Sequence, residues 1–238
     1  MQTVDILVFG AHADDAEIGM AGTILKHTRA GYTVGLCDLT RSEMSSNGTP
    51  ENRLEEANKA AEAMGIVLRS NLGLPDRGLS AGSKDQIDAI TKEIRLRKPR
   101  IVFAPYWEDR HPDHIACSHL VQEAVFNAKL RRYLPETEAF QVESLFFYFI
   151  NDTIDPDIVV DVSDAYPGKK EVLQAYRSQF SPPQVGEDIV LTPLNQNYVE
   201  RVEARDALLG QKRMMAYAEG FMSKLPVALQ YFLSKKGT

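Results

Sequence analysis

Two short motifs in this sequence carry side chains that can bind a metal ion or move a proton. The first is HADD at residues 12–15, and the second is HPDH at residues 111–114. Two neutral imidazoles and one carboxylate, here from His12, Asp15 and His114, are a common ligand set for catalytic zinc and leave coordination positions open. A divalent metal lowers the pKa of the water it binds and polarises a carbonyl group. The two motifs therefore predict a metal-dependent hydrolase site.

Hydrolysis of an amide also needs a base for the water proton and a donor that holds the oxyanion. Asp14 sits on a turn beside the proposed ligand Asp15, so we expect it to reach the activated water as the base. His111 lies on the loop that carries His114. We expect Asp113 to hold His111 protonated, so that its ring faces the developing oxyanion.

Structural explanations exist for each motif taken alone. An Asp pair after a strand often only caps a helix, because Asp is a favoured N-cap residue. A lone HxxH is more often surface or packing histidine. The two histidines outside the motifs, His27 and His119, fall inside predicted helices and are interpreted as structural. Three of the five histidines lie in the two motifs, and both motifs follow predicted strands, which favours a shared site over coincidence.

Apolar runs and helix-like segments alternate along the chain. The expected strands are Val4–Gly10, Thr33–Leu39, Ile66–Leu74, Arg100–Ala104, Glu143–Ile150, Asp157–Val162 and Ala216–Met222. The expected helices are Ile18–Ala30, a segment from Pro50 to Gly65, one from Ser83 to before Pro99, Ile115–Leu130, Ala165–Phe180 and Tyr198–Lys212. This order predicts an α/β fold, a Rossmann-like doubly wound, mostly parallel sheet with helices on both faces, in one domain of residues 1–238. Ligands bind such sheets beyond the carboxyl ends of the strands, where both motifs and Asp76 fall.

Two local predictions concern the helices beside the site. Thr49 is expected to cap the second helix, which presents an apolar face of Leu54, Ala57, Ala61 and Met64. Ser83, followed three residues later by Gln86, has the pattern of a capping box at the start of the third helix.

The composition places limits on partners and location. A net charge of −6 argues against an unspecific nucleic-acid binder, which normally has a basic face. Cys37 and Cys117 lie far apart in no redox or metal spacing, which favours a reducing compartment. No N-terminal signal and no apolar run of roughly 20 residues is present, so we expect a cytoplasmic protein without membrane contact.

The first motif region, AHADDAEIGMAGT, resembles the AHPDDE-x-x-G-x-G-G-T signature of the LmbE/PIG-L family of zinc-dependent N-acetylglucosamine deacetylases. HPDH is similar to the second motif of that family. The stretches SSNGT, LPDRGL, PYWEDRHPDH, AYRSQF and YAEGF extend the likeness over most of the chain and resemble the bacillithiol-biosynthesis branch most closely, whose members deacetylate N-acetylglucosaminyl malate. Ala13 replaces the usual Pro and Ala16 the usual Glu, which leaves open whether Glu17 takes the role of that Glu.

The resemblance implies roles for individual residues. It implies one divalent metal per chain on His12, Asp15 and His114, with zinc as the first expectation, although Fe, Co and Mn can use the same ligands. It also implies Asp14 as general base and later as acid to the leaving amine. His111 would stabilise the oxyanion, with Asp113 as its orienting partner.

Further residues are expected to bind an amino-sugar substrate. The family pattern places a substrate-contacting Arg at Arg53 and a sugar-hydroxyl acceptor at Asp76, and Arg110 sits beside His111. An Arg fits the malate carboxylates because its guanidinium binds them through two hydrogen bonds. The polar loop Arg41–Gly48 is either a lid or an ordinary surface loop. The apolar end, Leu225–Leu233, and the ring assemblies of the family imply a homo-oligomer such as a hexamer.

Two other functions compete with this interpretation. One is deacetylation of another acylated amino-sugar, such as N,N′-diacetylchitobiose. The other is a sugar- or nucleotide-binding module without catalysis, but no GxGxxG phosphate loop follows the first strand.

Overall fold

The computed structural model describes residues 2–151, 153–182 and 189–228. Its strands are β1 (Ile6–Gly10), β2 (Val34–Thr40), β3 (Leu68–Leu74), β4 (Ile101–Pro105), β5 (Ser144–Tyr148), β6 (Ile158–Asp161) and β7 (Ala218–Met222). Its helices are α1 (Asp15–Arg29), α2 (Pro50–Met64), α3 (Lys84–Arg97), α4 (Pro112–Ala128), α5 (Tyr166–Gln174), α6 (Arg177–Phe180), the short 3₁₀ helix η1 (Pro193–Asn195) and α7 (Tyr198–Gln211). Each expected strand is present with shifted ends. The helix expected over Ala165–Phe180 is two helices, because the backbone turns at Tyr176.

The strands form one sheet in the order β3-β2-β1-β4-β5-β7-β6. Pairing is parallel from β3 through β5, and β7 runs antiparallel to both β5 and β6. The doubly wound, mostly parallel sheet is therefore confirmed. The strand order reverses between β1 and β4, so the carboxyl ends of these two strands form the crevice in which such folds bind ligands.

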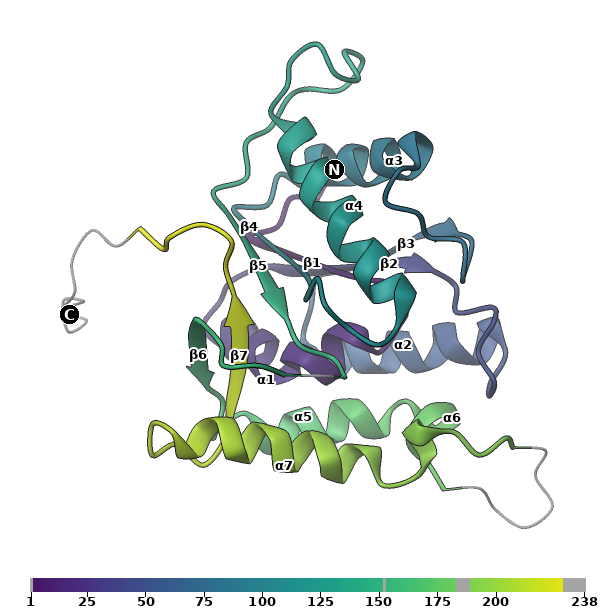
Figure 1. Ribbon diagram of the computed structural model, residues 1–238, viewed down its shortest axis with the longest axis vertical. Helices are drawn as coiled ribbons and strands as arrows, with labels where there is room; N and C mark the ends of the chain where they lie inside the picture. The colour runs from purple at the N-terminus through teal and green to yellow at the C-terminus, as the bar shows by residue number, and fades with distance from the viewer. Residues whose placement is uncertain (1, 152, 183–188, 229–238) are drawn as a thin grey trace.

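Helices cover both faces of this sheet, as Figure 1 shows. Helices α3 and α4 lie on one face and α1 and α2 on the other, where α5 packs against α1 and α2, and α7 packs against β6 and β7. Each face has its own apolar cluster. All five residues of β1 are buried, which explains its continuous apolar sequence and fixes the strand that ends at the first motif.

Helix α1 begins at Asp15, earlier than expected, and is kinked at Met20 (φ −152°, ψ 21°). Two charged side chains, Arg205 and the buried Glu219, replace the helical bond between Ile18 and Gly22. Arg205 donates to the Ile18 carbonyl (2.9 Å), and the Glu219 carboxylate accepts from the N–H groups of Gly22 (2.9 Å) and the next residue (2.7 Å). The helix that carries the first motif is thus held in place by side chains from α7 and β7.

Gly19 is required in α1 because the helix packs directly on β5 and the segment that follows it. A Cβ atom there would lie 2.2 Å from the Tyr148 ring and 2.9 Å from the Phe149 carbonyl oxygen. We expect Gly19→Ala to lower the free energy of unfolding by about 1–3 kcal/mol, although helix propensity alone would favour Ala. Chemical denaturation measures the change, with Gly82→Ala as the control, since no atom lies within 4 Å of a Cβ there. Equal stability of the two variants would show that this packing is not tight.

Two local predictions about the helices fail for a physical reason. Leu54 is 58% exposed, and the buried face of α2 instead contains Arg53, Ala57, Ala60 and Met64, because Arg53 turns inward to meet a carboxylate. Ser83 makes no side-chain cap at α3. The Gln86 side chain bonds to the backbone of residues 78 and 80, which removes it from the expected capping box. The Thr49 cap on α2 is confirmed by its bond from the Asn52 N–H (3.2 Å).

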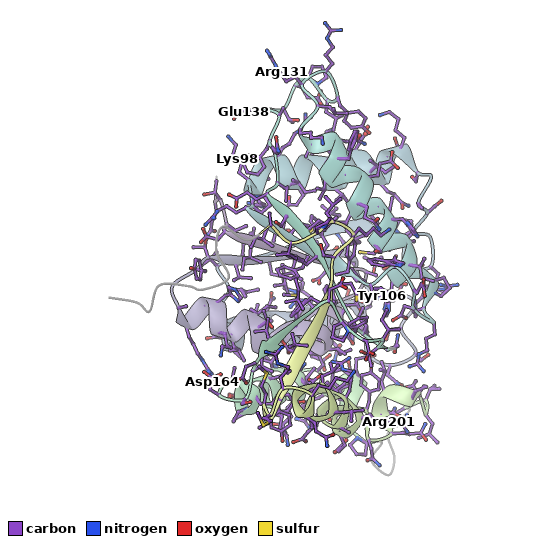
Figure 2. The ribbon with its side chains drawn as sticks, turned by 60° about the vertical axis from the view of Figure 1, so that its left-hand side comes forward. Lys98, Tyr106, Arg131, Glu138, Asp164 and Arg201 are labelled. Atoms are coloured by element: carbon purple, nitrogen blue, oxygen red, sulfur yellow. The ribbon has the colours of Figure 1, made fainter. Side chains whose placement is uncertain are left out.

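The end of the molecule away from α7 is formed by the loop between α4 and β5, where Arg131 and Glu138 are labelled in Figure 2. The buried Arg95 guanidinium organises this loop by donating to backbone carbonyls, including those of Tyr133 (2.7 Å) and Leu130 (2.8 Å). Among the described residues, none of the helices has the length and apolar character needed to cross a membrane. Of the apolar end, Leu225 is 77% exposed and residues 229–233 lie outside the described residues.

Candidate functional site

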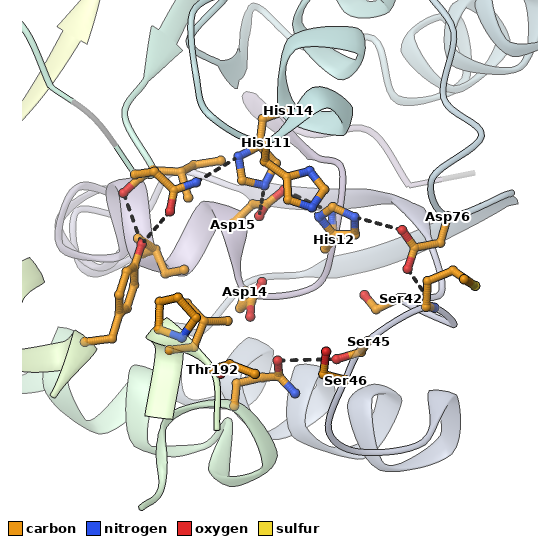
Figure 3. Close-up of a pocket in the computed structure, with 18 of the residues that line it drawn as sticks. His12, Asp14, Asp15, Ser42, Ser45, Ser46, Asp76, His111, His114 and Thr192 are labelled. Carbon is orange, nitrogen blue, oxygen red and sulfur yellow. Dashed lines mark hydrogen bonds and ion pairs between the residues drawn. The ribbon is translucent and has the colours of Figure 1, made fainter. Parts of the chain in front are cut away.

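The crevice at the switch point brings the two motifs together in a cavity of about 320 Å³. The first motif follows β1, the second follows β4, and Asp76 follows β3, so three strand ends contribute side chains (Figure 3). The cavity is lined by all the predicted site residues except Asp113: His12, Asp14, Asp15, Arg53, Asp76, Arg110, His111 and His114. Asp113 is buried within 3.6 Å of His12 Nε2.

The Asp15 carboxylate lies between His12 and His114, with one oxygen toward each ring. Asp15 Oδ1 lies 3.1 Å from His114 Nε2, and Asp15 Oδ2 lies 3.7 Å from His12 Nδ1. Ligands of a tetrahedral zinc ion at its usual bond lengths lie about 3.3 Å apart, so this spacing suits a single ion. The groups of three whose ligand atoms all lie within 4.8 Å of one another among the described residues are His12, His111 and His114, and His12, Asp76 and Asp113. The first of these groups contains both proposed histidine ligands.

The other ring nitrogen of each proposed histidine ligand faces a carboxylate. His12 Nε2 lies 3.2 Å from Asp76 Oδ1, and His114 Nδ1 lies 3.0 Å from Asp109 Oδ1. Histidines that bind metals in proteins usually donate their second N–H in this way, which fixes the tautomer and the ring orientation. The arrangement leaves His12 Nδ1 and His114 Nε2 available, and these are the nitrogens that face Asp15.

Asp109 was missed by the sequence interpretation, although it stands two residues before the second motif. Its carboxylate accepts from His114, from the His111 N–H (2.7 Å) and from the Asn151 side chain (2.9 Å). Asn151 in turn accepts from Arg110 (2.8 Å). No spacing rule singled out Asp109, because its partners come from the loop after β5 as well as from its own loop.

The pKa values of His12 and His114 are raised by the negative charge of the carboxylates around them. Burial works against the charged form of His12, but the nearby carboxylates of Asp113, Asp15 and Asp76 outweigh burial and hold its pKa well above the usual value. Burial likewise opposes charge on His114, yet Asp15 and Asp109 raise its pKa to about 9. A divalent cation would neutralise these carboxylates in place of the two protons, so the donor set fits a metal ion.

Asp14 stands next to this cluster in an unusual conformation. Its φ of 122° is one that residues other than glycine rarely adopt, and such strain is typical of functional positions. Burial raises the pKa of Asp14 to about 6, against the pull of Arg53, whose Nη2 lies 3.1 Å from Asp14 Oδ2. The carboxyl group is therefore poised near neutral pH, as a general base requires.

His111 has a different partner from the one expected. It is the N-cap of α4, and its Nδ1 accepts the backbone N–H of Asp113 (3.2 Å), so a neutral ring carries its proton on Nε2. The Asp113 carboxylate instead accepts from the Arg77 N–H (2.8 Å). Burial and the neighbouring histidines lower the pKa of His111. A neutral Nε2–H donor at the cavity wall fits these contacts better than the protonated ring expected from the sequence.

Arg53 is buried against Asp14 and also donates to the Ala13 carbonyl. Among the described residues, its Nε and Nη1 atoms have no hydrogen-bond partner. The sequence left open whether Glu17 takes the role of the family Glu that Ala16 replaces. Glu17 is fully buried and pairs with Arg69 Nη1 (2.6 Å) and the Tyr176 hydroxyl (2.6 Å). Glu17 is not among the residues that line the cavity.

The opposite wall of the cavity comes from loop 41–48 and from residues 192–194. Asn47 ties this loop to Val190 through two hydrogen bonds of 2.9 Å, and Gln179 donates to the Asn47 carbonyl (2.8 Å). The loop is therefore ordered against its neighbours and covers one side of the site.

Fold and site together define an α/β protein with a candidate divalent-metal centre at its switch point. The profile of the PIG-L family, described as GlcNAc-PI de-N-acetylase, matches residues 7–125, half of the chain. The chain belongs to this deacetylase family, and the resemblance drawn from its motifs is confirmed.

Relatives and solved structures agree with this membership. The chain is 30% identical to a diacetylchitobiose deacetylase of Thermococcus kodakarensis over 190 residues, 74% of this chain and 70% of the relative. It is 29% identical to a probable N-acetyl-alpha-D-glucosaminyl L-malate deacetylase 2 of Bacillus cereus, covering 73% and 83% of the two chains. The conserved protein TT1542 of Thermus thermophilus superimposes with a TM-score of 0.88 at 38% identity, over 98% of this chain and all of that one.

Proposed function

We propose that this protein removes the acetyl group from an N-acetylglucosaminide by metal-dependent hydrolysis, with N-acetylglucosaminyl malate of bacillithiol biosynthesis as its substrate. The observation that carries the proposal is the buried, strained Asp14 beside the group formed by His12, Asp15 and His114. Family membership supports the reaction class. The single domain, the oligomer and the cytoplasmic location expected from the sequence stay predictions.

The reaction assigns one step to each group. His12, Asp15 and His114 would hold the ion, which supplies Lewis acidity for the amide carbonyl and for a water nucleophile. Asp14 accepts the proton of the attacking water, and His111 donates its Nε2–H to the oxyanion. The C–N bond then breaks, and Asp14 returns the proton to the leaving amine, so that water and amide give acetate and a free amino-sugar.

Arg53 supports a substrate with a carboxylate on the aglycone. Its guanidinium lines the cavity, and its Nε and Nη1 atoms, which point in different directions, have no protein partner among the described residues, so each can donate to a substrate oxygen. Arg110, at the exposed edge of the same cavity, is the second candidate contact. A second function, deacetylation of N,N′-diacetylchitobiose, is favoured by the Thermococcus relative, which has that name.

Acetate release from a panel of substrates tests both functions. The zinc-loaded protein is assayed with N-acetylglucosaminyl malate, its methyl glycoside analogue and N,N′-diacetylchitobiose, before and after chelation. We expect release from the malate substrate at least tenfold faster than from the others, lost on chelation and restored by zinc. Indifference to malate would favour the chitobiose activity, and no release from any substrate would contradict the proposal.

Metal content tests the ligand set. His12→Ala and His114→Ala are each expected to lose stoichiometric zinc after dialysis, because each removes one of three protein ligands. His27→Ala is the control, since His27 is bonded to the Thr23 carbonyl within α1 (2.7 Å) and lies outside the cavity. Elemental analysis gives the result. Unchanged zinc in both ligand variants would show that the ion binds elsewhere.

A further inference from the structure

The turn after β3 connects the site to loop 41–48 through Asp76. One carboxylate oxygen of Asp76 lies 3.2 Å from His12 Nε2, and the other accepts the Met44 N–H (2.9 Å). In the opposite direction, the Asp76 N–H donates to Glu43 Oε1 (2.8 Å). One residue therefore contacts a proposed metal ligand on one side and two consecutive loop residues on the other. Figure 3 shows Asp76 beside His12.

The bond to His12 decides which ring nitrogen can bind a metal. A neutral imidazole has one proton, and an acceptor at Nε2 holds that proton there, which leaves the lone pair on Nδ1. Nδ1 is the atom that faces Asp15. Asp113 Oδ2 is the next acceptor near Nε2, at 3.6 Å, but it already accepts the Arg77 N–H. Asp76 is thus the main group that sets the tautomer of His12.

A direct contact between Asp76 and a sugar hydroxyl, as the family resemblance implied, fits the geometry less well. The Asp76 side chain is only 5% exposed, and both of its oxygens already accept from the protein. A role as metal ligand is the other alternative, because His12, Asp76 and Asp113 lie within ligand distance of one another. If Asp76 bound the ion, its Oδ1 would no longer be free to accept from His12 Nε2.

We propose that Asp76 is a positioning residue that orients His12 for the metal and anchors loop 41–48 over the site through Met44. This inference rests on the proposed metal centre. Metal loading and the order of the loop are then linked, because both depend on the same carboxylate. Neither consequence requires Asp76 to touch substrate or ion.

Asp76→Asn tests the proposal because His12 and Met44 contact different oxygens of Asp76, and in Asn one of these two acceptors becomes an NH2 donor. We expect the dissociation constant for zinc, measured by competition with a chelator, to rise 10- to 100-fold, as for other such carboxylates. Hydrogen exchange of segment 41–48 is expected to become faster. At saturating zinc, KM for the substrate is expected to stay within twofold while kcat falls.

Glu43→Ala is the matched control, since it removes a loop contact to Asp76 and leaves the bond to His12 in place. We expect faster exchange in segment 41–48 with zinc affinity within twofold of wild type. In the wild type, zinc is expected to slow hydrogen exchange of segment 41–48. In Asp76→Asn, zinc is expected to leave the exchange rate of this segment unchanged.

Other results would overturn the proposal. A raised KM with unchanged zinc affinity would make Asp76 a substrate contact. Two zinc ions in the wild type and one in Asp76→Asn would make it a ligand. Unchanged exchange in the variant would remove its role as loop anchor. Zinc affinity and exchange do not depend on turnover, so a wild type that releases no acetate would contradict the proposed function and leave this inference standing.

Discussion

Replacing Asp14 by Asn is expected to lower kcat by about 10²- to 10⁴-fold while zinc stays bound. The range is that of general acid–base catalysis, and Asn cannot accept the water proton. Asn also tolerates a positive φ better than most residues, so the strained backbone at φ 122° can be kept. Steady-state acetate release measures the loss of activity, and elemental analysis measures the bound zinc.

A stability control is needed because Asp14 faces the buried Arg53 at 3.1 Å. Neutralising the carboxyl group leaves this guanidinium bonded to the Ala13 carbonyl but without the charge of Asp14, so the midpoint of unfolding has to be compared with wild type. The comparison is made at a temperature where both proteins are folded. Full activity in a folded, zinc-loaded Asp14→Asn protein would show that another group is the base.

The pH profile gives a second view of the same residue. Burial raises the pKa of Asp14 to about 6, and the base must be ionised, so activity is lost as pH falls through that pKa. A nearby divalent cation favours the ionised form and moves the acid limb to lower pH. We expect the acid limb of kcat/KM at or below pH 6, and we expect it to be absent from the residual activity of Asp14→Asn.

The second large effect is on stability, and we expect it from Lys169→Met. Lys169 is fully buried, and its Nζ lies 2.7 Å from both Asp206 Oδ2 and Glu219 Oε1. Arg205 remains with Asp206 (2.9 Å), but Glu219 loses its cation. Removing one partner from a buried ion pair costs about 3–5 kcal/mol, so the free energy of unfolding is expected to fall by that amount. Denaturation in urea measures the change.

The neighbouring residue supplies the matched control. Lys170 pairs with Glu203 at 2.8 Å, but both side chains are partly exposed, so Lys170→Met is expected to leave the unfolding midpoint unchanged. Adding Glu219→Gln to Lys169→Met removes the uncompensated charge and is expected to recover part of the stability. Equal stability of the Lys169 and Lys170 variants would contradict this account of the cluster.

This cluster also connects stability to the site. Glu219 accepts the two N–H groups freed at the kink of α1, and Arg205 covers the Ile18 carbonyl on the other side. The first turn of α1 carries Asp15, so the position of a proposed ligand depends on charged side chains from α7 and β7. Some loss of zinc affinity is therefore expected in Lys169→Met.

Features of the fold that depend only on residues close together along the chain could be predicted from the sequence. The continuous apolar run of β1 and the helical segments between strands gave the doubly wound sheet, and the rule for strand ends placed both motifs at one edge. The Thr49 cap and the Gly65 end of α2 were also predicted, since each involves only a few consecutive residues. The buried face of α2 was not, because an inward Arg53 is explained only by a carboxylate on another element.

The motifs alone determined the identities of the groups that meet: three histidines and three aspartates from the segments that follow β1 and β4, with Asp76 nearby. Only the tertiary structure decided which carboxylate faces which ring nitrogen. It paired Asp76 with His12 and Asp109 with His114, and it moved the Asp113 carboxylate from His111 to Arg77. The physical reason is range: capping and periodicity act over a few residues, whereas these contacts are set by how β1, β3 and β4 lie in the sheet.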